Sequence, residues 1–97
     1  MSRTEKCIMP PNPHYSTVRS PLYCHRHEVF GASNRQKSIR DGLVVFLQPE
    51  MHNMSNRGVH FDREFDHYLK RIGEKTWCKH YGKTIDDFIE EYGRNYL

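Results

Sequence analysis

The chain has 97 residues, of which 36% are hydrophobic, and its mean hydropathy is −0.89. This length supports one small domain with a thin core, so a large enzyme with a separate cofactor domain is excluded. No apolar run approaches the ~20 residues of a membrane helix, and the N-terminus lacks the apolar centre of a secretory signal. These features argue against a membrane partner and favour a cytoplasmic protein.

The cysteines and the charges narrow the function classes further. Cys7, Cys24 and Cys78 form no close pair, which argues against a disulfide scaffold and against a zinc ribbon. The formal net charge is +3, but residues 1–60 carry eight Lys or Arg against four acidic residues, whereas residues 61–97 carry seven against eight. This distribution is expected if the first half of the chain faces a polyanion such as DNA or RNA.

The first half is predicted to contain two strands. Residues 1–21 are expected to form an irregular arm, because prolines remove backbone donors and disfavour helix. Residues 22–30 alternate in polarity and predict a strand, whereas the polar, basic residues 35–42 indicate a loop or one short helical turn. The β-branched and aromatic run 43–47 predicts a second strand, which we expect to pair with the first.

The second half is predicted to be helical. A proline suits a first helical turn, so a short helix is expected over 48–52. Apolar residues recur at three to five residue spacing over 61–81 and predict an amphipathic helix. Thr84 and Asp87 have the spacing of a capping box, which predicts the start of a last helix over 85–92.

Imidazole and carboxylate groups gather around the two predicted strands. His27 and Glu28 end the first strand, His52 follows the second strand, and His60 lies eight residues later. Such groups are the usual ligands of divalent transition metals, and a helix that covers a β-hairpin would bring these positions together. Basic residues nearby are candidate phosphate contacts, which would make nucleic-acid binding sensitive to salt. They are Arg26, Arg35, Lys37 and Arg40.

Several short strings resemble small phage and prophage proteins of the HNH (His-Me finger, ββα-metal) endonuclease superfamily. The strings are His27-Glu28-Val29-Phe30-Gly31, Asn34-Arg35, Lys37-Ser38, Gly42-Leu43-Val44-Val45, His52-Asn53 and Gly58-Val59-His60. The resemblance covers residues 22–97 and implies an α+β fold. In that fold a β-hairpin and a short helix (the ββα-metal core, residues 22–60) pack against two C-terminal helices in the extension 61–97.

The resemblance also implies metal-dependent hydrolysis of phosphodiester bonds in DNA, in the cytoplasm of a bacterial host. His27 and Glu28 fall on the paired positions of base and metal ligand, His52 on the helix ligand, and His60 on a further ligand. Either His27 activates the water and Glu28 binds the ion, or the roles are reversed; we favour His27 as the base. One divalent cation is expected, with Mg²⁺ or Mn²⁺ for catalysis, and Zn²⁺ or Ni²⁺ also suits these ligands.

The chain departs from the family pattern in two ways. The middle Asn of the HNH motif has no clean counterpart, because Leu43 stands near its place and only Asn34 and Asn53 are candidates. Many relatives also bind a structural zinc through paired cysteines, which this chain lacks. We expect apolar packing, supplied by the proline-rich arm, to replace that zinc.

Two other readings remain open. The same histidines could hold a structural ion in a non-catalytic module that binds DNA or a protein partner in phage recombination or packaging. A pure protein-interaction module, such as an inhibitor, is a third class. A thin core and an exposed arm would also suit a homodimer.

Overall fold

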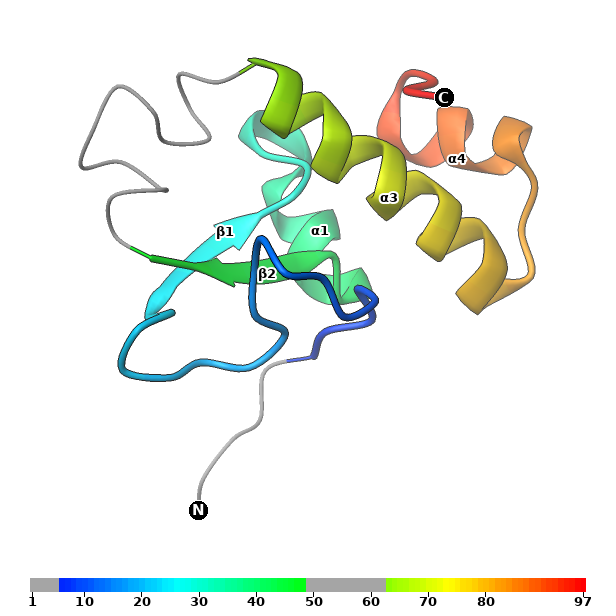
Figure 1. Ribbon diagram of the computed structural model, residues 1–97. Coiled ribbons are helices and arrows are strands. Elements are labelled where there is room, and N and C mark those ends of the chain that lie inside the picture. Colours follow the sequence, from blue (N-terminus) through cyan, green and yellow to red (C-terminus); the bar gives the residue numbers. More distant parts are fainter. Residues whose placement is uncertain (1–5, 49–62) are drawn as a thin grey trace.

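The computed structural model describes residues 6–48 and 63–97 (Figure 1). Their elements are, in chain order, β1 (His25–Glu28), η1 (Ala32–Asn34), α1 (Arg35–Asp41), β2 (Val44–Leu47), α3 (Arg63–Tyr81) and α4 (Ile85–Tyr92). The predicted α+β class is confirmed, because these ranges contain an antiparallel strand pair and three α-helices. None of the helices in these ranges combines the length and the apolar character needed to cross a membrane.

The two predicted strands pair with each other, as expected. His27 lies opposite Val45, and Glu28 lies opposite Val44. All four residues of β2 are buried, which explains why its sequence is a continuous β-branched and aromatic run. β1 is shorter than the predicted strand 22–30.

The connection between the strands is more ordered than the sequence indicated. A seven-residue helix, α1, replaces the expected loop or single helical turn. The buried Ser38 hydroxyl fixes its position by accepting a hydrogen bond from the Phe30 amide (3.2 Å) and donating one to the Leu43 carbonyl (2.6 Å). Gly42 ends the helix with a φ of 82°, a left-handed conformation that glycine adopts without strain.

The proline-rich arm covers one edge of the strand pair. Residues 6–21 are irregular, as predicted, and Ser16 forms two backbone hydrogen bonds with Phe46 of β2 (2.9 and 2.8 Å). Met9 and Tyr15 of the arm are buried in the core. The arm therefore satisfies part of an exposed strand edge and adds apolar side chains to the core.

The two C-terminal helices agree closely with prediction. α3 begins within two residues of the predicted start, and α4 has the predicted bounds. The Thr84 side chain accepts from the Asp87 amide (3.1 Å), and the Asp87 carboxylate accepts from the Thr84 amide (2.9 Å), so the capping box is present. The short helix predicted over 48–52 falls almost entirely on residues 49–62, which lie outside the described residues.

Helices α3 and α4 form one layer that packs against α1 and the strand pair (Figure 1). Close contact with α3 depends on Gly73, because a Cβ atom there would lie 2.9 Å from Cε2 of Phe30. Phe30 itself is 1% exposed and contacts the rings of Phe88 and Tyr92 at centroid distances of 5.3 and 5.0 Å. The core thus joins the end of β1 to both helices.

Candidate functional site

The candidate site begins at the end of β1. His27 is only 6% exposed, whereas the side chain of Glu28 is 18% exposed. The chain continues into the buried residues Val29 and Phe30, and the Val29 amide donates a hydrogen bond to the Leu43 carbonyl (3.0 Å). Because the strand pair anchors one side of this dipeptide and the core anchors the other, its backbone is held firmly.

A pocket of about 620 Å³ opens beside this dipeptide. Its walls come from the end of β1, the turn into α1, the N-terminal half of α3 and the C-terminal segment. The lining residues are His27, Glu28, Val29, Phe30, Gly31, Ala32, Ser33, Asn34, Arg35, Arg63, Asp66, Lys70 and Tyr96. The pocket therefore combines an imidazole, two carboxylates and three cationic side chains from separate parts of the chain.

Ion pairs organise the charges of the pocket. Glu28 binds two guanidinium groups, with Nε of Arg26 at 3.1 Å and Nε of Arg35 at 3.3 Å. Lys70 pairs with Asp66 one helical turn before it, at 2.7 Å. The resulting surface presents both metal-ligand chemistry and phosphate-binding chemistry within one hollow.

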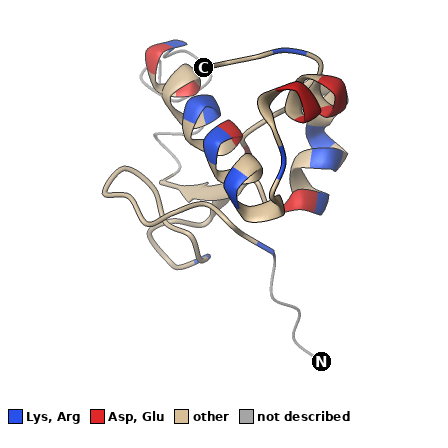
Figure 2. Ribbon diagram, turned by 90° about the vertical axis from the view of Figure 1, so that its right-hand side faces the viewer, with Lys and Arg blue, Asp and Glu red and all other residues tan. Residues whose placement is uncertain are grey.

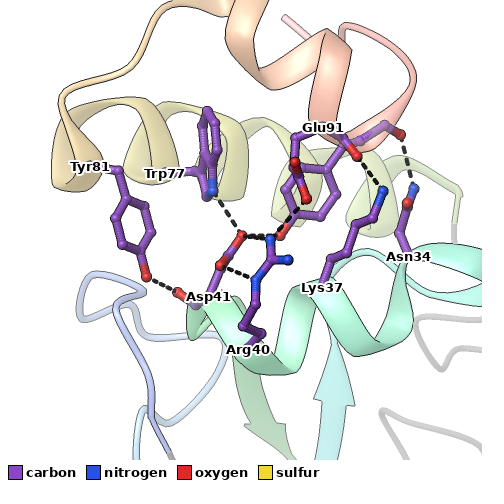
Figure 3. A network of polar contacts seen from close by, with 8 residues as sticks. Asn34, Lys37, Arg40, Asp41, Trp77, Tyr81 and Glu91 are labelled. Carbon is purple, nitrogen blue, oxygen red and sulfur yellow. Dashed lines mark hydrogen bonds and ion pairs between the residues drawn. The ribbon is translucent and has the colours of Figure 1, made fainter.

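The four basic residues predicted to contact phosphate lie in different surroundings. Arg35 lines the pocket, and Arg26 contacts Glu28 at its edge. Lys37 instead donates to the Glu91 carbonyl of α4 (2.6 Å), and Arg40 pairs with the Glu91 carboxylate (2.9 Å) (Figure 3). The four basic residues therefore do not form one group: Arg26 and Arg35 lie at the pocket, whereas Lys37 and Arg40 join α1 to α4.

The contacts of Arg40 belong to a network centred on Asp41 (Figure 3). Arg40 donates two hydrogen bonds to the Asp41 carboxylate (2.8 and 2.9 Å), and Trp77 and Tyr92 each donate one (2.9 and 2.8 Å). Burial raises the pKa of Asp41, but the hydrogen bonds from Arg40, Tyr92 and Trp77 outweigh burial and leave the pKa below its ordinary value. Asp41 is thus an ionised structural centre that joins α1, α3 and α4.

The predicted metal ligands are only partly within the described residues. His52 and His60 lie outside them, so their distances to His27 and Glu28 are not described. Within residues 6–48 and 63–97, no group of three or more His, Cys, Asp or Glu side chains is arranged to hold a metal ion. His27 and Glu28 are the two predicted ligands that the structure brings to the pocket.

The candidates for the middle Asn also differ in their surroundings. Asn34 lines the pocket, but its amide group donates to the Tyr92 carbonyl (2.9 Å), which ties the start of α1 to α4. Leu43 is fully buried beside β2, and Asn53 lies outside the described residues. Asn34 therefore has a structural contact that accounts for its orientation.

Several lining residues were not recognised from the sequence. The sequence pattern places Arg63, Asp66 and Lys70 among the charges of an amphipathic helix, and it assigns Tyr96 no part in the site. The i,i+4 spacing of Asp66 and Lys70 was a usable signal for an ion pair. No local signal indicates that this part of α3 faces the end of β1, because that contact depends on the tertiary fold.

Comparison of the chain with protein-family models, with curated proteins and with solved structures finds no match.

Proposed function

We propose that the protein hydrolyses phosphodiester bonds of DNA in a metal-dependent reaction at the pocket beside His27 and Glu28. One observation carries this proposal: an imidazole and a carboxylate at a strand end share a single hollow with three cationic side chains, Arg35, Arg63 and Lys70. Acid–base and ligand groups next to phosphate-binding groups are the combination that phosphodiester cleavage requires.

The residues present suit a divalent cation in chemical type. Imidazole nitrogen and carboxylate oxygen are both accepted by Mn²⁺, Zn²⁺ and Ni²⁺, and carboxylate oxygen suits Mg²⁺. With His27 as the base, Glu28 would supply the ligand from β1, and His52 and His60 would complete the set. When bound, the ion would supply Lewis acidity and neutralise charge on the phosphate.

The side chains of the pocket have distinct roles in this proposal. His27 takes a proton from the attacking water, because a neutral imidazole nitrogen can act as a general base. Arg63 and Lys70 bind phosphate oxygens and orient the scissile group. Glu28 keeps Arg35 at the rim through their ion pair, so that the guanidinium is in place before substrate binds.

The order of elements also supports the proposal. A ββα-metal fold needs an antiparallel strand pair followed by a helix, with a histidine at the end of the first strand. The chain has the antiparallel pair of β1 and β2, and His27 is the third residue of the four in β1; the short helix expected after β2 lies almost entirely outside the described residues.

Plasmid nicking tests the proposed reaction. Supercoiled plasmid is incubated with Mg²⁺ or Mn²⁺ and the wild type, His27→Ala, His52→Ala or a control variant, His80→Ala, whose exposed side chain lies at the other end of α3. We expect His27→Ala to slow nicking by about 100-fold or more, since a general base contributes about that much, and EDTA to stop it. His80→Ala should nick like the wild type. Equal nicking by all four proteins would refute the proposal.

Thermal melting separates catalysis from the alternative of a metal-stabilised binding module. A catalytic ion is removable with the fold retained, so EDTA should leave the melting temperature nearly unchanged. A structural ion contributes folding free energy directly, so EDTA would unfold the chain. Unfolding by EDTA without nicking by the metal-loaded protein would therefore favour the binding module over the nuclease.

A further inference from the structure

The solvent-facing side of α3 carries a basic or imidazole side chain at every fourth position. All of these side chains are exposed along the 19-residue helix. They are Arg63, His67, Arg71, Lys75 and Lys79, hereafter the α3 ridge. Side chains four residues apart form one continuous row on a helix surface, inclined at about 26° to the axis. With a rise of 1.5 Å per residue, this row spans about 24 Å along the helix axis.

Most charges of the α3 ridge are not engaged by other residues within the part of the chain that the structure describes. Among the residues that the structure describes, no hydrogen bond or ion pair engages the side chains of Arg63, Arg71, Lys75 or Lys79. By contrast, Arg35, Arg40 and Lys70 pair with carboxylates. Like charges four residues apart destabilise a helix, so the α3 ridge has a local disadvantage that an anionic partner would relieve.

The acidic residues of α3 do not neutralise the ridge. Asp66 is committed to Lys70, and Glu74 is fully buried, where its carboxylate accepts from the Tyr96 amide (2.7 Å). Glu64 is the one exposed acidic residue of α3. Figure 2 shows the outcome, with blue bands repeated along α3 and red bands gathered on α4. The exposed charged side chains of α3 are therefore mostly basic.

The ridge starts at the candidate site. Arg63 lines the pocket beside His27 and also lines a second hollow of about 430 Å³, together with Glu64, His67 and Arg71. His67 is held in that hollow by donating from Nε2 to the Tyr96 carbonyl (2.9 Å). A chain of phosphates that follows the ridge toward the start of α3 would arrive at the mouth of the pocket.

We propose that the α3 ridge binds the phosphate backbone of double-stranded DNA and leads it to this pocket. The ridge spans about 24 Å along α3, which is several times the 3.4 Å axial spacing of the charges on one strand of a duplex, so its length suits contact with more than one phosphate. The helix holds Arg71, Lys75 and Lys79 at axial intervals of about 6 Å, with Arg63 about 12 Å before Arg71, which suits a repeating polyanion. The binding does not depend on the metal chemistry proposed above, because the surface would hold DNA whether or not the pocket cleaves it.

A second copy of the chain is the competing occupant, because α4 is acidic. Two of its four acidic residues are already engaged, Asp87 in the capping box and Glu91 with Arg40. Only Asp86 and Glu90 remain to face a basic ridge on another copy. The charge complementarity therefore favours DNA over self-association.

Fluorescence anisotropy with a labelled 25-base-pair DNA duplex in EDTA tests this proposal without hydrolysis. The ridge variant Arg71→Gln/Lys75→Gln is compared with the control Lys83→Gln/Arg94→Gln, which removes the same charge outside the ridge. We expect the ridge variant to raise Kd about 10-fold or more and to reduce the slope of log K against log salt by about 1.8, since each phosphate contact contributes about 0.9. The control should stay within about two-fold of the wild type, and Arg71→Lys/Lys75→Arg should bind like the wild type.

Three results would overturn the proposal. The first is an equal loss of DNA affinity in the ridge variant and the control, which would indicate net charge alone. The second is unchanged DNA binding with reduced self-association in sedimentation velocity, which would assign the ridge to a second copy. The third is tighter binding of a duplex RNA of the same sequence. Failure of plasmid nicking, by contrast, would leave this binding result unaffected.

Discussion

Replacement of Asp41 tests whether the network between α1, α3 and α4 stabilises the fold as its geometry indicates. Asp41→Ala removes the acceptor for Trp77 and Tyr92, whose donor groups are both buried. It also removes the partner of Arg40, whose side chain is 56% exposed. The buried hydrogen bonds from Trp77 and Tyr92 should therefore contribute much more to the free energy of unfolding than the exposed ion pair with Arg40.

The expected loss follows from these contacts. A buried donor left without an acceptor costs about 1–3 kcal/mol, so the two donors of Trp77 and Tyr92 together cost about 2–6 kcal/mol. The exposed pair with Arg40 adds only about 0–1 kcal/mol. The total free energy of unfolding of a small domain is about 5–15 kcal/mol, so Asp41→Ala should remove a large part of the stability. Asp41→Asn keeps one acceptor oxygen and should lose less.

Urea and thermal unfolding measure this loss. For a domain of this size each kcal/mol lowers Tm by about 4–8 °C, so Asp41→Ala should melt at least about 8 °C below the wild type. The control is Glu90→Gln, which removes one exposed charge from α4 without touching the network. Because the pKa of Asp41 is lowered, its ionisation stabilises the fold fully above the ordinary value of 3.8, and this contribution disappears as the pH falls through the lowered pKa. A Tm of Asp41→Ala within 2 °C of the wild type at neutral pH would refute this reasoning.

Two further changes test the packing of α3. Gly73→Ala should lower the free energy of unfolding in urea by about 1–3 kcal/mol, because the new Cβ would lie 2.9 Å from Phe30. This clash should outweigh the higher helix propensity of alanine. A variant as stable as the wild type, or more stable, would contradict the close contact. Burial raises the pKa of Glu74, opposed by the Tyr96 amide, so the folded state loses stability as the pH rises from the ordinary value of 4.5 through the raised pKa. Glu74→Gln should therefore melt above the wild type at pH 7, with a gap that closes at pH 4; a gap independent of pH would contradict the buried charge.

The elements that sequence patterns predicted well are those with strong local signals. The strand 43–47 has a continuous β-branched and aromatic run, and α4 has a capping box and the left-handed Gly93 at its end. These signals lie within a few residues of the structure they specify. They are therefore visible without knowledge of the tertiary fold.

Helix α1 shows why other features were missed. Its sequence has little apolar periodicity, and it is held by Asp41 and Lys37 through contacts with residues far along the chain. The same dependence on long-range contacts explains why Arg35 lies at the pocket while Lys37 and Arg40 contact α4. A run of basic residues indicates a positive segment, but only the fold determines which side chains face a ligand.

Diffraction from crystals of the protein soaked in Mn²⁺, with data that record the anomalous signal, tests the central claim most directly. The proposed function predicts one Mn²⁺ peak within about 2.5 Å of His27 or Glu28, with His52 or His60 as a further ligand. A peak at another position, or a structure in which His27, His52 and His60 diverge so that no ion contacts two of these groups, would contradict it.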